Sequence, residues 1–353
     1  MASRRLRYQM CTEMYLSALL LCVYPFRSKW SKIIGLGIYT AVMTTVHSSA
    51  CAITVLITTS LSLNTILAWK SQFAKKQWRF LLEALPKNPG RNPGRIIWYT
   101  TVILLGIASV HEYQEMHFLP SRLLHQTCMS LIYVGVSINS MFVNKLLKSI
   151  EANVVDILTK LEAEIETQNR IVASKMGSND CFSMYMSVSQ MDTIVTSYLR
   201  VLRGIQYFNE LFGLTIVGLA ILLTSSIANA LYILFIKDTQ IEANIWRSVL
   251  IKTTKDSISY LVYCFLYIEP CMKTTSHLDE AVKLTCRLST KLPHNSTNLS
   301  YVSLQRKLDL LNKQLTSCKP YFSASGLFDV DYAIFSYIFA GISSVVIVYV
   351  QLM

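Results

Sequence analysis

The side chains that could do chemistry gather first between residues 111 and 118. His111-Glu112 begins like the H-E-x-x-H zinc motif, but Glu115 stands where the second histidine is required, and His117 is out of register. We therefore predict no metal site. Histidines, carboxylates and aromatic rings beside an apolar segment favour recognition of a small organic molecule, although an ordinary interfacial belt of Tyr and His explains them equally well. The ligand-binding candidates here are His111, Glu112, Tyr113 and Glu115.

A second group of candidates surrounds charges in an apolar stretch. Lys252 and Asp256 are four residues apart, so they can pair on one face of a helix. Charges at membrane depth are costly and usually face protein or water, so these two could line a ligand pocket or outer vestibule. The alternative is that the apolar segment begins later and leaves the lysine at the interface. Tyr260 and Tyr263 follow at helical spacing, as pocket or core residues, and Tyr133 of another apolar segment is the last ligand-binding candidate.

The sequence contains no nucleophile paired with a base, no phosphate-binding loop and no nucleotide motif, so we predict neither an enzyme nor a cofactor. Its nine cysteines are scattered without a C-x-x-C pair, which indicates buried apolar side chains and reduced thiols. The net charge of +12 is first a topology signal, and it does not predict a nucleic-acid partner.

The elements that must position these residues are membrane helices. Hydrophobic residues make up 52% of the chain and charged residues only 15%, against about 25% in soluble domains. Apolar runs of bilayer length predict an all-α membrane protein with seven transmembrane helices. The spans cover residues 31–48, 50–69, 96–113, 121–144, 211–236, 248–270 and 331–353. Only His47-Ser48-Ser49 separates the first two, and if these form one broken helix the count falls to six.

Basic residues indicate how the chain threads the membrane. Seven spans place the segments 1–32, 70–95, 145–205 and 271–320 on one side, and these segments hold 28 of the 33 Lys and Arg. The positive-inside rule puts that side in the cytoplasm. We therefore predict a multi-pass plasma-membrane protein with an intracellular N-terminus and an extracellular C-terminus, the inverse of a G-protein-coupled receptor.

Apolar stripes extend several helices beyond the membrane. After the fourth span, large aliphatic residues recur every three or four positions to about Gln168. They are Leu147, Ile150, Val154, Leu158, Leu161 and Ile165. Further helices are predicted at about 190–210, running into the fifth span, and at about 300–315. Together these helices are expected to form a cytoplasmic anchor bundle, either within one subunit or also between subunits.

The last span, 331–353, differs from the others. It contains no Lys or Arg, and small or polar side chains recur along it at three- and four-residue steps. They are Ser336, Ala340, Ser343, Ser344 and Gln351, with Ile347 on the same face. Such a stripe on an apolar helix suits close helix packing or the lining of a water path, and the sequence leaves both open.

The end of the chain also resembles a known family. Insect gustatory receptors finish in a helix with Thr-Tyr, five hydrophobic residues and Gln-Phe; here the same spacing reads Ser344-Val345, five apolar residues and Gln351-Leu352. The segments 209–213 (NELFG) and 326–331 (GLFDVD) are similar to family segments at the fifth span and before the last helix. The chain thus resembles a divergent gustatory receptor, closer to bitter-type than to sugar receptors.

The resemblance implies a tetrameric, ligand-gated, non-selective cation channel. The last helices of four subunits would surround one pore, with Gln351 as a polar ring and Leu352 as a hydrophobic ring that closes by dewetting. The remaining pore lining would be Ile347, Ser344, Ala340 and Ser336. A small organic tastant, such as a bitter compound, would bind among the other spans, and the remaining partners would be membrane lipid and identical copies or other gustatory receptors.

The expected organisation has three parts. Residues 1–270 would form the transmembrane ligand-binding region, with cytoplasmic helical extensions at 145–210. Residues 271–330 would form a cytoplasmic anchor segment, and 331–353 the pore-lining span.

Three other functions share parts of this pattern. An insect odorant receptor channel has the same architecture, and the long cytoplasmic loop and the Gln-ending helix favour the gustatory branch. A seven-span signalling receptor without a pore would have its C-terminus inside the cell. A transporter would show internal repeats with broken helices in matching halves, and the sequence shows none.

Overall fold

A computed structural model describes the chain in six stretches: residues 74–83, 120–173, 180–235, 243–291, 299–317 and 320–352. Every regular element in these stretches is a helix, and their only extended pairing is an isolated antiparallel bridge between Ser323 and Asp329. The all-helical prediction is confirmed for this part of the chain. The expected spans at 31–48, 50–69 and 96–113 lie outside it.

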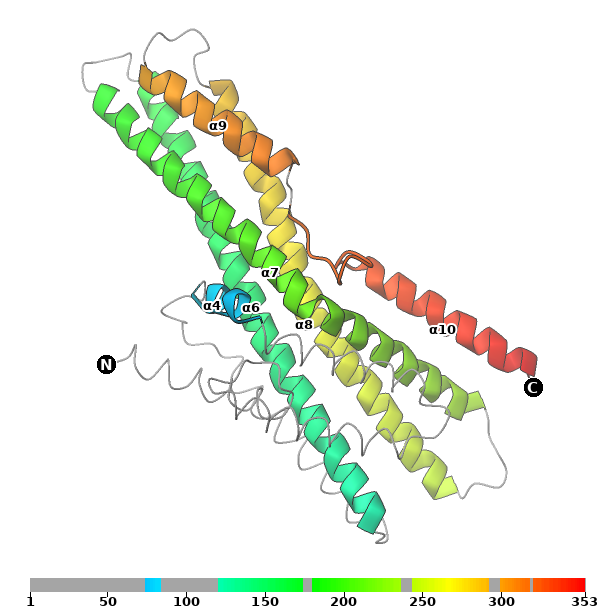
Figure 1. Cartoon of the computed structure of the whole chain (residues 1–353). Coiled ribbons are helices and arrows are strands. Elements are labelled where there is room, and N and C mark those ends of the chain that lie inside the picture. Colours follow the sequence, from blue (N-terminus) through cyan, green and yellow to red (C-terminus); the bar gives the residue numbers. More distant parts are fainter. Residues whose placement is uncertain are drawn as a thin grey trace. The chain divides into compact units, whose positions relative to one another are not determined.

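The described helices fall into short and very long ones. They are α4 (Lys75–Glu83), α6 (Pro120–Ala173), α7 (Asp180–Phe235), α8 (Ala243–Lys291), α9 (Leu299–Ser317) and α10 (Ala333–Leu352) (Figure 1). α6, α7 and α8 contain 54, 56 and 49 residues, which corresponds to roughly 70–85 Å of helix. A bilayer core is only about 30 Å thick. Each of the three is therefore longer than a membrane span, as the apolar stripes predict for α6 and α7.

Helix α8 extends beyond the expected sixth span. The sequence places this span at 248–270, but the helix continues through Pro270 to Lys291. Its continuation carries a buried stripe at three- and four-residue steps: Cys271, Thr274, Leu278, Ala281, Thr285 and Leu288. A stripe that mixes threonine and cysteine with leucine escapes a search for aliphatic periodicity, and a proline inside a helical pattern suggests its end.

Membrane-spanning composition is clearest in α7. Among the described residues, Val188–Leu231 is the one helical stretch long and apolar enough to cross a bilayer, and half of its most apolar window is buried. The segment Ala333–Ser344 of α10 is shorter and also apolar. The core helix of a soluble protein can be equally long and apolar. This stretch alone therefore does not identify a membrane protein.

The described helices belong to two compact units. Unit 1 draws on Met1–Lys145, Asn209–Ile268 and Ser323–Met353. Unit 2 consists of Leu146–Phe208 and Glu269–Phe322. The helices α6, α7 and α8 contribute to both units, which are described separately below.

Unit 2 has an aliphatic core of regular stripes. The stripe predicted on α6 is buried at Leu147, Ile150, Val154, Leu158 and Leu161. α7 contributes Met191, Ile194, Tyr198, Val201 and Ile205, and α9 contributes Leu304, Leu308, Leu311 and Leu315. Burying one large aliphatic side chain contributes about 1.5–3 kcal/mol. These stripes, more than local propensity, therefore hold the long helices together.

The predicted α6 stripe differs from the structure at its end. Ile165 is only half-buried, whereas Glu164 is buried. The Nε2 of Gln168 donates a hydrogen bond of 2.8 Å to the Glu164 Oε1. Positions 161, 164 and 168 keep the three- and four-residue spacing. The buried face of α6 therefore continues, but its last side chains are polar.

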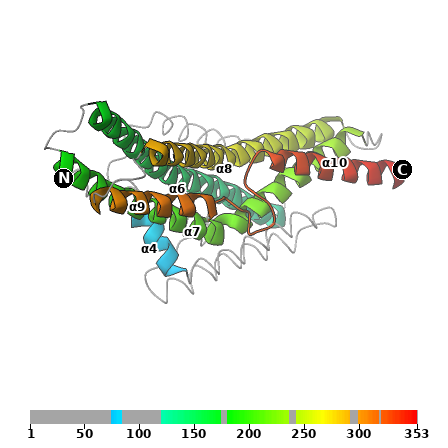
Figure 2. The same ribbon diagram turned by 90° about the horizontal axis from the view of Figure 1, so that it is seen from above.

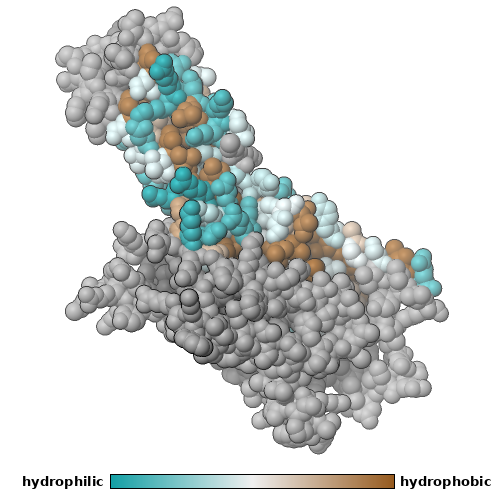
Figure 3. Space-filling model, in the orientation of Figure 1, coloured by the Kyte–Doolittle hydropathy of each residue, from teal (hydrophilic) through white to brown (hydrophobic). Residues whose placement is uncertain are grey.

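Helix α9 packs along α7 and α8 in unit 2 (Figures 1 and 2). The Tyr198 hydroxyl of α7 donates to the carbonyl of Gln314 at 3.3 Å. The Cys286 thiol of α8 donates to the Asn312 side-chain oxygen at 3.5 Å. Hydrophilic residues cover much of the described face of this unit, interrupted by apolar ones (Figure 3). This is the distribution of a helical bundle surrounded by water.

Unit 1 shows the opposite distribution on α8. Its exposed face is mainly apolar: Ile251, Ile258, Val262 and Phe265 are exposed there beside Thr254, whose hydroxyl donates to a carbonyl of its own helix. Towards α7, the hydroxyls of Ser226 and Ser257 lie 2.9 Å apart, within hydrogen-bond distance. Apolar side chains outside and hydroxyls between helices are typical of helices packed in lipid.

The short helix α4 is fixed in unit 1 by an aromatic contact. The Trp78 ring lies 5.8 Å from Phe142 of α6 and meets Phe212 of α7 edge-on at 5.6 Å between ring centroids. Edge-to-face aromatic pairs contribute about 0.5–1.5 kcal/mol beyond the area they bury. One tryptophan therefore joins three helices at this point.

Candidate functional site

The inner face of α10 is apolar and packed against its own subunit. Ile334, Ile338 and Ile342 recur at four-residue steps and are all buried. The Phe335 ring lies 4.9 Å from Phe265 of α8, centroid to centroid. Near the middle of the helix, a Cβ added at Gly341 would lie 3.5 Å from the Thr224 methyl of α7. These contacts seat α10 on α7 and α8, as Figure 2 shows.

The opposite face of α10 is exposed, and it is the face that the sequence analysis assigns to a pore. Its described side chains are Ser336, Ala340, Ser343, Ser344, Ile347 and Gln351. The hydroxyls of Ser343 and Ser344 each donate at 2.9 Å to the carbonyl four residues earlier, which satisfies them within the helix. Leu352 ends the helix, and its side chain lies outside the described residues.

Large aromatic side chains border this exposed face. Phe339 is 65% exposed and Tyr337 is 63% exposed, on either side of the stripe. In Figure 3, pale and brown residues alternate along α10 up to a hydrophilic tip. A helix that met only lipid would have no reason to turn serines outward, so this face is a candidate surface for protein or water.

A tight turn precedes α10. The backbone amide of Leu327 donates to the carbonyl of Ala324 at 3.1 Å. The two central residues, Ser325 and Gly326, have positive φ angles of 55° and 77°. Positive φ at both central positions defines a type I′ turn. The Ala324 amide also donates to the Phe328 carbonyl at 2.9 Å, so the hairpin loop holds three residues, 325–327. The bridge between Ser323 and Asp329 closes this hairpin.

The hairpin docks on the start of the expected fifth span. The side-chain oxygen of Asn209 accepts a hydrogen bond of 3.0 Å from the backbone amide of Ser323. One helical turn later, Gly213 leaves room for the hairpin, because a Cβ there would lie 2.5 Å from the Ser325 nitrogen. On the other side of the hairpin, the Asp331 carboxylate accepts from the Ala333 amide at 2.9 Å and caps α10.

The structure thus brings together the two segments singled out by resemblance. Residues 209–213 supply the acceptor and the gap, and residues 326–331 supply part of the turn and the cap. Both segments are recognised in the sequence, but nothing there predicts that 209–213 contacts Ser323 and Ser325, which immediately precede 326–331. An asparagine and a glycine four residues apart on one helix face were the available signal, since together they suit close docking of a backbone segment.

The expected ligand-binding residues are placed only in part. Asp256, Tyr260 and Tyr263 share one face of α8, opposite its exposed apolar face, and the two rings lie 6.5 Å apart. Tyr263 is buried, whereas Asp256 and Tyr260 are half-buried. The side chains of Tyr133 and Lys252 lie outside the described residues, as do His111, Glu112, Tyr113 and Glu115 entirely.

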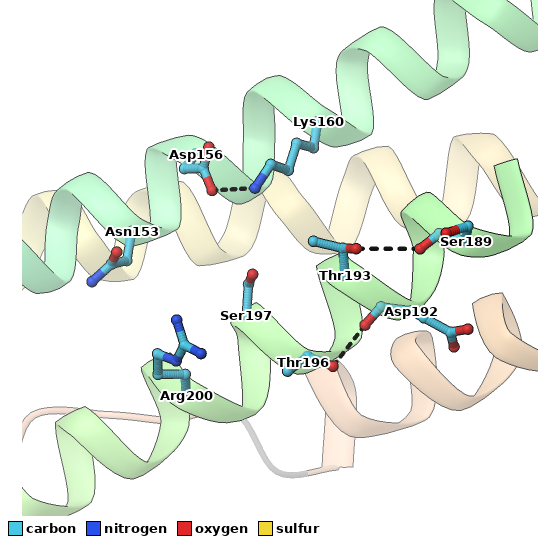
Figure 4. A pocket seen from close by; sticks show the side chains of 9 residues that line it. All are labelled: Asn153, Asp156, Lys160, Ser189, Asp192, Thr193, Thr196, Ser197 and Arg200. Atoms are coloured by element: carbon cyan, nitrogen blue, oxygen red, sulfur yellow. Dashed lines mark hydrogen bonds and ion pairs between the residues drawn. The ribbon is translucent and has the colours of Figure 1, made fainter. Parts of the chain in front are cut away.

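Unit 2 contains a polar hollow of about 510 Å³ between α6 and α7 (Figure 4). Its charged members are two acids and two bases: Asp156, Lys160, Asp192 and Arg200. Lys160 pairs with Asp156 at 2.5 Å, and the Thr193 and Thr196 hydroxyls donate to carbonyls of their own helix. The balanced charge and the internal bonding favour a water-filled hollow and indicate no particular ligand.

The described residues contain no cluster of three or more His, Cys, Asp or Glu side chains that could hold a metal ion. The sequence analysis likewise predicts no metal site in the chain. The site that remains is therefore the outer face of α10 with its docked hairpin, together with the tyrosine face of α8.

Comparisons with known proteins agree with this architecture. A family model described as "7tm Chemosensory receptor" matches residues 2–352. The solved structure of the insect olfactory receptor OR5 from Machilis hrabei in complex with eugenol is similar, with a TM-score of 0.63 and 11% sequence identity over 100% of both chains. At this identity, the structural match shows a shared fold. No curated protein matches the sequence.

Proposed function

Because the chain belongs to the 7tm chemosensory receptor family, we propose that it is a gustatory receptor channel in which a small organic tastant opens a non-selective cation pore. The family match makes it a chemosensory receptor and a multi-pass membrane protein, whereas taste, the pore and its gate belong to the proposal. Unit 2 would lie in the cytoplasm with the N-terminus, and the end of α10 would lie outside the cell.

The observation that carries the proposal is the exposed face of α10. On α8, the large exposed side chains from Ile251 to Phe265 are aliphatic or aromatic, which suits contact with lipid. On α10, the exposed face carries serines, an alanine and Gln351. Such a face needs protein or water opposite it. Four copies around a closed rotation axis would turn the four faces towards one another and provide both.

The proposed gate lies at the end of α10. Gln351 would form a polar ring and Leu352 a hydrophobic one that closes by dewetting. Below them, Ile347, Ser344, Ala340 and Ser336 would line the conduit. The Ser344 hydroxyl donates to its own helix, which leaves its oxygen lone pairs for a cation, and a single neutral oxygen would bind that cation weakly. Weak binding suits conduction, because an ion must leave each site as easily as it enters.

The proposed ligand site includes the tyrosine face of α8. Asp256, Tyr260 and Tyr263 combine a charge with two aromatic rings on the side of α8 away from its apolar exterior. The candidates Tyr133, Lys252 and the 111–115 segment complete it as predictions. The similar olfactory receptor was solved with eugenol, a small organic molecule, which supports the same ligand class here. The ligand must bind the open state more tightly to open the pore.

The proposal can be tested by substituted cysteines and electrical recording. Cells expressing the receptor are screened with a compound panel, and a charged thiol reagent is applied to Ala340→Cys during the response. We expect block of the current. Ile258→Cys on the lipid-facing side of α8 is the matched control and should leave the current unblocked, as should the unsubstituted chain. Responses that require G-protein signalling and survive substitution of Gln351 would contradict the proposal.

An odorant receptor channel is the second candidate, and the match to an olfactory receptor over the full length of both chains favours it. The two candidates share the pore and differ in the ligand. A panel that contains volatile odorants and water-soluble bitter compounds separates them. A response confined to volatile compounds would favour the odorant candidate. A seven-span signalling receptor is separated from both by a C-terminal tag, which would be detected only after permeabilising the cells.

A further inference from the structure

The middle of α8 contains a proline that leaves one backbone carbonyl without its helical partner. Pro270 has no amide hydrogen, so it cannot donate to the carbonyl four residues earlier, which belongs to Leu266. The proline ring also presses against that carbonyl. A carbonyl left unpaired in an apolar environment is costly. Leu266 therefore needs a donor from outside its own helix.

Asn144 of α6 supplies that donor. Its side-chain nitrogen, Nδ2, lies 2.5 Å from the Leu266 oxygen, 122 residues away in sequence. Asn144 is half-buried and stands at the end of the expected fourth span. The Asn144 side chain of α6 thus donates to the same α8 carbonyl that Pro270 leaves without a helical donor.

The same turn of α8 touches the pore helix. Phe265, adjacent to Leu266, packs against Phe335 in the first turn of α10, with ring centroids 4.9 Å apart and ring planes tilted by 37°. A shift of the Leu266 backbone therefore moves the ring on which α10 rests. The route from Asn144 to α10 consists of one hydrogen bond, one peptide unit and one aromatic contact, all within unit 1.

We propose that Asn144 is a positioning residue of the gate: its bond to Leu266 replaces the one removed by Pro270 and fixes the proline-weakened turn of α8 beneath α10. With the bond made, α8 is held to α6 in one arrangement. With it broken, α8 flexes at the proline and the seat of α10 shifts. The effect on gating rests on the proposed channel function, whereas the replacement of the lost hydrogen bond does not.

A double-mutant cycle tests the replacement without any channel activity. Asn144→Leu removes the donor and should lower the unfolding midpoint of the purified full-length receptor by about 2–4 °C. Pro270→Ala restores a backbone donor for Leu266, so in that background Asn144→Leu should cost much less. If Asn144→Leu does not fold, recovery of folded protein by Pro270→Ala is the expected result. Equal losses in both backgrounds, or no recovery, would overturn the proposal.

Recording from the same variants tests the effect on the gate. We expect Asn144→Leu to shift the ligand concentration for half-maximal current by at least about 3-fold, because it changes the gating equilibrium. The shift should vanish when Pro270→Ala is added. Asn153→Leu makes the same chemical change further along α6 and should leave the response unchanged.

The two tests separate failure of this inference from failure of the proposed function. Coupled stabilities without ligand-evoked current in any form of the chain, wild type included, would remove the channel and keep the hydrogen-bond replacement. Currents in the wild type together with additive stabilities would keep the channel and remove the role of Asn144. Coupled stabilities with an unshifted ligand response would also overturn the assignment of Asn144 to the gate.

Discussion

Unit 1 and unit 2 use the same long helices and distribute polarity in opposite ways. In unit 2, leucines such as Leu308 point inward and charged residues cover the outside. In unit 1, α8 turns Ile258 and Val262 outward and keeps its Ser257 hydroxyl between helices. Both arrangements satisfy their surroundings, because water rewards apolar burial, whereas lipid gives no hydrophobic reward for it. Helix α8 therefore follows two packing rules along its length: polar side chains outside in unit 2 and mainly apolar side chains outside in unit 1.

Helix α10 follows neither rule, and this contrast gives it functional meaning. It belongs to unit 1, yet between the exposed Tyr337 and Phe339 it turns outward a stripe of small and polar side chains, whereas the exposed face of α8 is mainly apolar. Its buried face, with Ile334, Ile338 and Ile342, is as apolar as the core of unit 2. A stripe of small and polar side chains on the outside of an otherwise apolar helix favours contact with protein or water over contact with lipid.

The largest expected effect comes from placing the same charge on the exterior of each unit. Ile258 is 58% exposed and Leu310 is 50% exposed, so lysine fits sterically at both. Ile258→Lys puts a charge near the middle of a membrane span and should cost about 2.5–3.5 kcal/mol of insertion free energy. Leu310→Lys meets water and should change the stability by less than about 0.5 kcal/mol.

Surface expression and size-exclusion profiles of the two lysine variants measure this difference. Loss of correctly inserted receptor is expected for Ile258→Lys only. If both variants express and elute like the wild type, the contrast between a lipid-facing and a water-facing exterior is wrong. If both fail, Leu310 of α9 is covered by something other than water.

The next effect tests the docked hairpin against an ordinary helix contact. Gly213→Ala would place a methyl group 2.5 Å from the Ser325 nitrogen and displace the hairpin, at a cost of about 1–3 kcal/mol. Gly341→Ala on α10 is the control, because its methyl group would lie 3.5 Å from Thr224, an ordinary contact. Thermal unfolding of both variants gives the comparison. Equal midpoints would show that the hairpin is not docked at Gly213.

Much of the fold of unit 2 follows from the periodicity of its sequence, because a helix in water must turn its apolar side chains to one buried face. The stripes of α6 and α9 in unit 2 are regular, and their burial at Val154 and Leu308 matches the predicted spacing. The continuation of α8 after Pro270 was not predicted, since its stripe uses threonine and cysteine. The buried Glu164 was not predicted, because the stripe was assigned to aliphatic side chains and Ile165 was therefore chosen in place of its polar neighbour.

The candidate site is predictable only as faces, and its contacts are not. Spacing alone places Ser336 and Ala340 on one face of the last helix. No local pattern reports that Asn209 bonds Ser323 or that Asn144 bonds Leu266, because each pair is more than 100 residues apart. Pro270 was the one sequence signal for the second bond: a proline inside a helix always releases a carbonyl.

A smaller effect is expected from the hydroxyl pair between helices in unit 1. Ser226→Ala removes its 2.9 Å contact with Ser257 and should cost about 0.6–1.7 kcal/mol, the range for interhelical hydrogen bonds in membranes. Ser225→Ala is the control, because its hydroxyl donates within its own helix, to the Ile221 carbonyl. Chemical unfolding in detergent measures both. A larger loss for Ser225→Ala would show that the hydroxyl pair does not hold α7 to α8.

The smallest effect belongs to the ion pair between α9 and α7 in unit 2. The Lys307 ammonium lies 2.5 Å from the Asp192 carboxylate, whose side chain is 63% exposed. An exposed pair contributes about 0.2–1 kcal/mol and is screened by salt. A double-mutant cycle with Lys307→Ala and Asp192→Ala should show coupling at low ionic strength that disappears near ~1 M salt. The Ser226–Ser257 cycle should keep its coupling at both salt concentrations, since a pair of hydroxyls carries no net charge to screen. If both couplings depend on salt in the same way, the two units do not differ in their surroundings. The pore assignment of α10 would then lose the contrast on which it depends.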